Sequence, residues 1–176
     1  SAMRRTGYLL LLFLLLSLAG CRTERAADFD DLGWQALAQG DHRAAIAAFE
    51  RSVKLNPTAQ AYLGLGIAFD LKGDFDQALH HLNEALALDG NNAQAYYCRG
   101  NVRGSLGDYT GALTDFGRTI ELEPGHAQAY LSRGATMIEL GSFVRARDDL
   151  TRALALTNDP ALRTQIEAAL RAIEPR

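Results

Sequence analysis

The sequence contains little cysteine and no concentration of basic residues. Of 176 residues only Cys21 and Cys98 are cysteines, which excludes a disulfide framework or a four-cysteine metal site. Eighteen Lys and Arg residues stand against 21 Asp and Glu residues, for a net charge of −3, and no run of five Lys or Arg residues occurs. Because phosphate binding needs a clustered basic surface, we expect no nucleic-acid partner.

Short enzyme motifs are also missing. The chain has no G-x-S-x-G, P-loop, H-E-x-x-H or C-x-x-C pattern, and no set of titratable residues that would assemble a catalytic centre. His80 and Glu84 are four residues apart on one predicted helix, with Asp76 four residues earlier. A metal site would need further ligands, so we interpret this group as a solvated helix face. We expect neither an enzyme nor a bound cofactor or metal.

An apolar segment lies near the N-terminus. Arg4 and Arg5 precede a leucine-rich run from Tyr8 to Gly20. At about 1.5 Å per residue a helix of this run covers roughly 20 Å, which is short of the roughly 30 Å hydrocarbon core of a membrane. The pattern is typical of a secretory signal peptide. We assign residues 1–20 to this leader, with Ser1 and Ala2 as a cloning scar.

The four residues Leu18-Ala19-Gly20-Cys21 resemble the lipobox of bacterial lipoproteins. The resemblance implies that the chain is cut before Cys21 and that this cysteine is lipidated, with palmitate among its acyl chains. Several acyl chains together hold a protein stably at a membrane. Arg22 occupies the position where Asp favours retention in the inner membrane, so the periplasmic face of the outer membrane is the favoured location. Residues 21–28 are then the lipidated cysteine and a short tether.

A unit of about 34 residues is used four times. Ala-Gln-Ala-Tyr begins at 59, 93 and 127, and three other sets of small residues share the register in steps of 33, 34 and 34. The predicted repeats are 26–58, 59–92, 93–126 and 127–160. The sets are Gly33, Gly66, Gly100 and Gly134; Gly40, Gly73, Gly107 and Gly141; and Ala45, Ala78, Ala112 and Ala146.

Each repeat is predicted to be a pair of helices, A and B. The second glycine of each repeat ends helix A in a left-handed conformation, and the residue after it, Asp41, Asp74, Asp108 or Ser142, caps helix B. This pattern resembles the tetratricopeptide repeat, which implies an all-α, right-handed solenoid. Residues 161–176 form a closing helix and tail, since Leu162, Ile166 and Leu170 fall on one helical stripe after Asp159-Pro160.

Two arginines replace leucine at repeat position 7 in the last two repeats. Helix B changes with them, because position 23 becomes Asp in the same two repeats. An arginine between helices needs a carboxylate partner. We therefore predict structural ion pairs Arg99–Asp115 and Arg133–Asp149; the alternative is that the arginines bind a ligand.

The face of helix A opposite helix B contains repeat positions 2, 5, 9, 12 and 13. In the tetratricopeptide repeat family this face lines a concave groove, and here it has no lysine or arginine. A clamp for a C-terminal carboxylate therefore lacks its lysines and retains only one asparagine. The groove is predicted to be apolar and mildly acidic, with these residues contacting a partner: Trp34, Leu37, Leu63, Ile67, Asp70, Tyr97, Asn101, Leu131 and Ile138.

The resemblance implies an interaction protein of the bacterial cell envelope. The first hypothesis is a lipid-anchored scaffold or adaptor that binds an apolar, neutral-to-basic segment of another envelope protein. One alternative is a pilotin-like factor that escorts a secretin of a type IV pilus or secretion system. Another is a structural protein that forms a homodimer through the apolar groove.

Overall fold

The computed structural model describes residues 25–173, and this part of the chain consists of α-helices and has no β-strand. Each predicted repeat is a pair of antiparallel helices A and B, and a single helix follows the last pair. The A helices are α2 (Ala26–Ala38), α4 (Ala59–Lys72), α6 (Ala93–Ser105) and α8 (Ala127–Glu139). The B helices are α3 (His42–Leu55), α5 (Phe75–Leu88), α7 (Tyr109–Leu122) and α9 (Phe143–Leu156), and the last helix is α10 (Pro160–Ala172).

Turns between helices A and B follow one design. The glycine after each A helix has a φ angle between 71° and 82°. This is a left-handed backbone conformation that residues other than glycine disfavour. At the start of α3 the Asp41 side chain accepts a hydrogen bond from the Ala44 N–H at 3.0 Å. Asp74 and Asp108 do the same at α5 and α7. The predicted caps are therefore confirmed at three of the four B helices.

The fourth B helix departs from that design. Ser142 occupies the N-cap position of α9, but its side chain makes no capping hydrogen bond, so that part of the prediction is wrong. The closing helix begins as predicted, with Pro160 in its first turn and the Asp159 carboxylate accepting from the Ala161 N–H at 2.9 Å. α2 begins at Ala26, so residues 26–28 belong to this helix and not to a tether.

Glycine at repeat position 8 allows close packing of helices A and B. A Cβ atom placed on Gly33, at position 8, would lie 2.6 Å from the Phe49 ring, and one on Gly64, at position 6 of the next repeat, would lie 2.4 Å from the same ring. Phe49 is therefore held between glycines of α2 and α4 and is completely buried. The equivalent residues Leu82, Phe116 and Leu150 are also buried, and each packs against the position-8 glycine of its own repeat.

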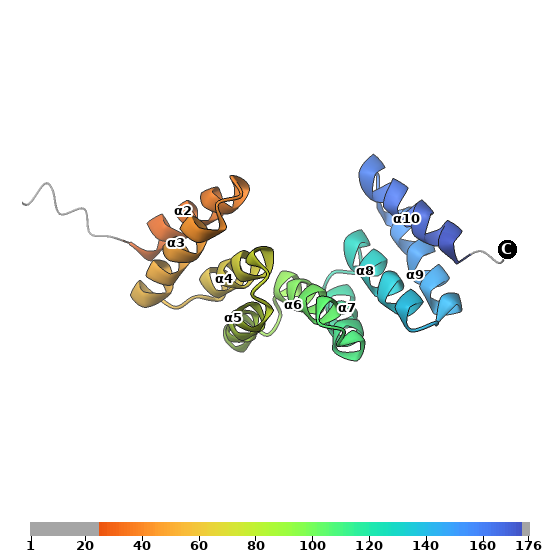
Figure 1. The fold of residues 1–176 in the computed structure, drawn as a ribbon, viewed down its shortest axis with the longest axis horizontal. Coiled ribbons are helices and arrows are strands. Elements are labelled where there is room, and N and C mark those ends of the chain that lie inside the picture. Colours follow the sequence, from red (N-terminus) through yellow and green to blue (C-terminus); the bar gives the residue numbers. More distant parts are fainter. Residues whose placement is uncertain (1–24, 174–176) are drawn as a thin grey trace, which may run out of the picture.

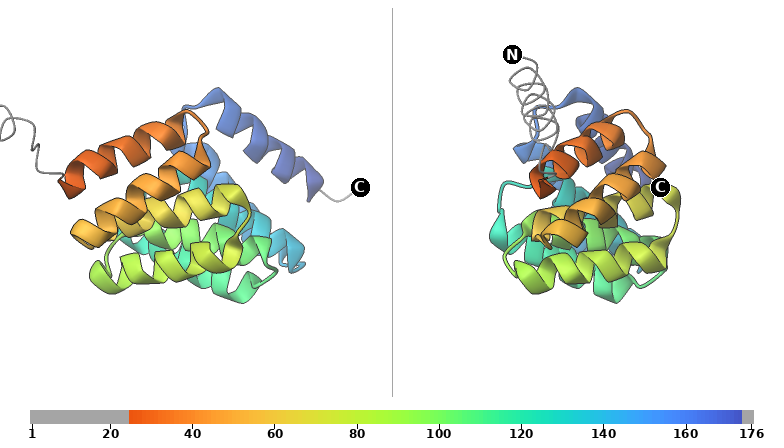
Figure 2. Two further views of the ribbon diagram at one scale, coloured as in Figure 1. Left: turned by 60° about the vertical axis from the view of Figure 1, so that its left-hand side comes forward. Right: turned by 90° about the vertical axis from the view of Figure 1, so that its left-hand side faces the viewer.

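The helix pairs follow an arch whose two arms are α2–α3 and α9–α10 (Figure 1). Successive A helices contact one another, and α10 continues that row by contacting α8. B helices contact no other B helix among the described residues. The A helices therefore form the shorter, concave side of the arch, and the B helices form the convex side. Figure 2 shows the helix layers from two further directions.

Buried apolar side chains form two separate clusters. The first runs through α2 to α6 and includes Phe49, Leu65 and Leu82. The second joins α8, α9 and α10 around Leu150 and Ile166. Within residues 25–173 no helix is both long and apolar enough to cross a membrane.

Candidate functional site

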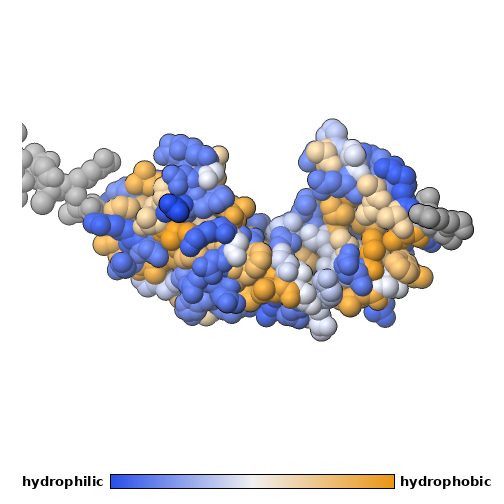
Figure 3. Space-filling view, viewed as in Figure 1, coloured by the Kyte–Doolittle hydropathy of each residue, from blue (hydrophilic) through white to orange (hydrophobic). Residues whose placement is uncertain are grey.

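The surface is hollowed between the two arms of the arch (Figure 3), on the side lined by the A helices. Five of the predicted groove residues are partly exposed apolar side chains that rest on the buried clusters. Their exposed parts leave apolar surface available along the concave side. They are Trp34, Leu37, Ile67, Tyr97 and Ile138.

Two predicted groove residues are not available to a partner. Leu63 is 4% exposed and Leu131 is 9% exposed, and both belong to the buried clusters. Leu63 packs in the cluster that runs from α2 to α6, and Leu131 packs in the cluster of α8, α9 and α10. We therefore correct the prediction: these two leucines belong to the buried core and offer little surface to a partner.

The aromatic residues of the groove are held in position by contacts with other rings of the protein. The Trp34 ring meets the Phe49 ring edge-to-face, with 5.2 Å between centroids. Tyr97 packs between Phe116, at 6.0 Å, and His126, at 5.0 Å. Because these rings are positioned before any partner binds, they lose little conformational freedom on binding, which is the usual property of aromatic anchors.

Acidic groups accompany this apolar surface. Burial raises the pKa of the Asp70 carboxyl above its usual value, and one buried carboxylate oxygen of Asp30 makes no hydrogen bond within the described part of the chain. A cationic group from a partner would stabilise both ionised carboxylates. Asn101 is partly exposed on α6, between the Asp70 and Ile138 helices.

Both predicted ion pairs are present. Arg99 donates from Nε to Asp115 at 2.9 Å and from Nη2 at 2.7 Å. Arg133 donates to Asp149 in the same bidentate way, from Nε at 2.7 Å and from Nη2 at 2.9 Å. The hydrogen bonds that it donates to Asp149 raise the pKa of Arg133. Because each guanidinium is already paired within its own repeat, these arginines hold helices A and B together and do not line the groove.

A third arginine joins the first pair. Arg103 donates from Nη1 to Asp115 at 2.8 Å, so one buried carboxylate accepts hydrogen bonds from two arginines. Arg99 also donates to Asn83 of the preceding repeat at 2.7 Å. The sequence carried a signal for Arg103, since it lies four residues after Arg99 and therefore on the same helix face.

Histidine replaces the aspartate at position 23 in the second repeat. The His81 ring stacks on Phe69 at 5.3 Å and on Tyr62 at 6.0 Å. Desolvation and the neighbouring His80 lower the pKa of His81, against opposing effects of Glu50 and Glu84. Across residues 25–173 no group of three or more His, Cys, Asp or Glu side chains is placed to hold a metal ion.

The chain belongs to the tetratricopeptide repeat family, whose family model matches residues 31–93 and 97–161. It therefore has the fold of a protein–protein interaction scaffold. Among curated proteins none matches the sequence.

Several solved structures share the fold. TTC0263, a TPR protein of Thermus thermophilus, is 24% identical, with a TM-score of 0.75 over 84% of this chain and 82% of that one. YrrB, a TPR protein described as having an unusual peptide-binding site, is 22% identical, with a TM-score of 0.70 over 81% and 74%. Pseudomonas aeruginosa pilF is 19% identical, with a TM-score of 0.75 over 84% and 68%. At these identities the likeness is one of fold.

Proposed function

We propose that this protein is a scaffold that binds an apolar, neutral-to-basic segment of a partner protein on its concave face. The observation that carries the proposal is the row of positioned, partly exposed apolar side chains from Trp34 to Ile138, accompanied by Asp70. Exposed apolar surface of this kind is typical of interaction sites. The described peptide-binding site of YrrB supports a peptide as the form of the ligand.

Binding should depend on the aromatic anchors. In affinity capture from bacterial membranes, Trp34→Ala and Tyr97→Ala should each lose the captured partner, because each removes an anchor from the groove. Leu88→Ala is the control, since Leu88 is an exposed leucine at the end of a B helix. Retention of the partner by both aromatic variants would overturn the groove as the binding site.

Charge reversal tests the acidic half of the proposal. Asp70→Lys should weaken a captured basic segment by about ten-fold or more, because it replaces attraction by repulsion. Asp148→Lys is a matched control on the exposed surface of α9. Equal affinities of the two variants for a basic segment would contradict the electrostatic part.

We further propose that the scaffold is anchored at the periplasmic face of the outer membrane through lipidated Cys21. The support is the lipobox-like sequence Leu18-Ala19-Gly20-Cys21, which lies outside the described residues. In a bacterial host Cys21→Ser should abolish acylation and leave the leader uncut, as measured by mass spectrometry. Cys98→Ser should be processed normally, because this second cysteine is buried in α6. An unmodified Cys21 in the unaltered chain would refute the anchor.

The identity of the captured partner separates the adaptor from its pilotin-like alternative. An envelope hydrolase or protease supports an adaptor. A secretin subunit whose outer-membrane assembly fails without this protein supports a pilotin-like role.

A further inference from the structure

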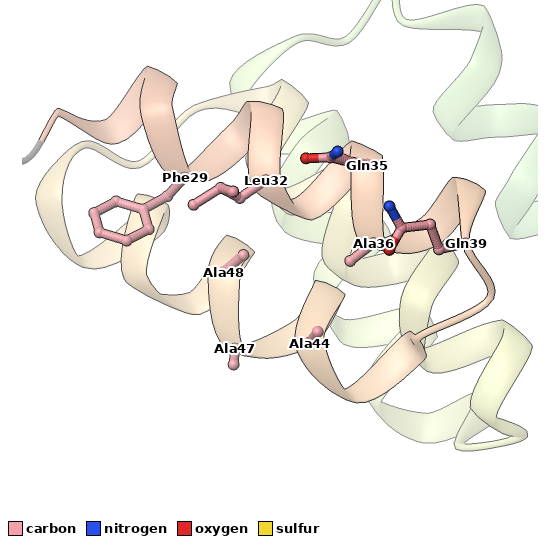
Figure 4. A pocket seen from close by; sticks show the side chains of 8 residues that line it. All are labelled: Phe29, Leu32, Gln35, Ala36, Gln39, Ala44, Ala47 and Ala48. Atoms are coloured by element: carbon pink, nitrogen blue, oxygen red, sulfur yellow. The ribbon is translucent and has the colours of Figure 1, made fainter.

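The first repeat presents an apolar end face to solvent. Side chains of α2 and α3 line a hollow there (Figure 4), and Leu32, one of the lining residues on α2, is 52% exposed. We call this surface the N-terminal end face. Its lining residues are Phe29, Leu32, Gln35, Ala36, Gln39, Ala44, Ala47 and Ala48.

Comparison with the second repeat shows that the equivalent surface there is an interface between repeats. Leu65 holds the same repeat position as Leu32 but is 1% exposed, because α4 packs on helix α3 of the preceding repeat. Among the described residues no helix covers the equivalent surface of the first repeat. The N-terminal end face therefore has the composition of an interface between repeats and remains open.

The other end of the solenoid is closed. α10 packs on α9 and buries Ile166 completely, and its exposed side carries Arg163 and Arg171. The outer side of α10 in a second copy therefore offers charge where the N-terminal end face offers Leu32. The N-terminal end face of a second copy does match, since both surfaces are apolar and contain small residues that permit close approach of helices.

Charged residues beside the N-terminal end face can pair with those of a second copy. Arg43 and Glu50 are exposed on α3, and they lie on the same flank of Ala47 because seven residues make almost two helical turns. If two α3 helices pack antiparallel about a two-fold axis near Ala47, Arg43 of each copy faces Glu50 of the other. Opposite charges therefore face each other on that flank of the contact.

We propose that two copies of this protein associate through their N-terminal end faces, with α2 and α3 of one copy packed antiparallel on α2 and α3 of the other. Each helix is about 20 Å long and 10 Å wide, so the contact lies at the small end of specific interfaces. The association is therefore concentration-dependent. It leaves the concave face free, and it does not depend on what binds there.

The test is sedimentation equilibrium of the full chain over a wide concentration range. The unaltered chain should pass from monomer to dimer, and Leu32→Glu should weaken dimerisation by about ten-fold or more, because it places charge in the centre of the contact. Leu88→Glu, at an equally exposed leucine of α5, should dimerise normally. Ala47→Glu is a second disrupting variant, should Leu32→Glu lose its helical circular dichroism.

A charge swap tests the antiparallel geometry. Arg43→Glu alone and Glu50→Arg alone should each weaken the dimer, and the double variant should restore it, because only opposite charges then face each other again. A monomer at every concentration would overturn the proposal. So would a dimer that survives both Leu32→Glu and Ala47→Glu but is lost with Trp34→Ala, since the contact would then lie on the concave face. Failure of the double variant to restore association would overturn the antiparallel arrangement.

Discussion

The second and third repeats have different kinds of residues at the same positions between helices A and B. In the second repeat Leu65 lies at position 7 and His81, stacked between Tyr62 and Phe69, lies at position 23. In the third repeat Arg99 and buried Asp115 occupy those positions and form a two-pronged ion pair. The two helix pairs nevertheless share one architecture. The glycine, alanine and large apolar positions therefore define the repeat, while positions 7 and 23 are free to vary as a pair.

The two kinds of seam should respond differently to the loss of one partner. An apolar seam that loses a side chain loses contacts, whereas a charged seam keeps an uncompensated buried charge. The third repeat is the extreme case, because Asp115 is 1% exposed and serves both Arg99 and Arg103.

The largest effect is expected for Asp115→Ala. It leaves two arginines without their carboxylate and should lower the free energy of unfolding by about 3–5 kcal/mol. Asp149→Ala should cost less, because Asp149 accepts from one arginine and its side chain is 10% exposed. Denaturant unfolding of both variants measures the difference. Equal losses would show that the second arginine adds nothing.

The next largest loss of stability is expected when a methyl group is added where helices A and B pack closely. Gly66→Ala places a Cβ atom 2.5 Å from Leu82 Cγ and should destabilise the protein by about 1–3 kcal/mol. Gly134→Ala, in the fourth repeat, meets Leu150 at 3.1 Å and should cost less. Gly104→Ala is the control, because nothing lies within 4 Å of its Cβ and alanine favours helix. A Gly66→Ala protein as stable as the control would contradict the packing argument.

The aromatic seam should make stability depend on pH. The folded state lowers the pKa of His81, so the unfolded chain binds the proton more readily. The contribution of His81 to stability is therefore complete above its ordinary pKa of 6.5 and declines as the pH falls through that value towards the lower, folded one. His81→Phe should flatten this decline in unfolding measurements from about pH 8 to about pH 5. An unchanged pH profile would show that His81 is not responsible.

The smallest expected effect is on the alkylation rate of the Cys98 thiol, which measures how readily α6 opens. Burial, with a smaller contribution from Asp70, raises the pKa of Cys98 to about 11, so the reactive thiolate is scarce at neutral pH. Alkylation of Cys98, followed by peptide mass spectrometry, should be slow in the folded protein and fast in denaturant. Asp70→Asn should accelerate it slightly. Rapid labelling of the folded protein would indicate that α6 opens readily.

Local rules recovered most of the fold from the sequence. Glycine with positive φ, aspartate caps and position-8 glycines are decided within one repeat, as are the pairs Arg99–Asp115 and Arg133–Asp149. Each depends on residues of a single helix hairpin, so the repeat period is enough to predict it.

Features that depend on curvature could not be predicted in the same way. A helical wheel shows that Leu63 and Leu131 face away from their own helix B, but it does not show that the folded solenoid buries them. The exposed fraction of Trp34 or Tyr97 likewise depends on the bend between repeats. Site residues were therefore harder to predict than the fold, since the groove is formed by several repeats together.

The unequal spacing of the two helix rows determines how the molecule deforms. Contacts between successive A helices act as a series of pivots, whereas no B helix of residues 25–173 braces another across the outer side. Small rotations at the pivots add up along a solenoid whose repeats touch only their neighbours. The distance between the two arms of the arch is therefore the dimension of the protein that changes most easily. Segments of different thickness can fit between the arms without repacking any single repeat.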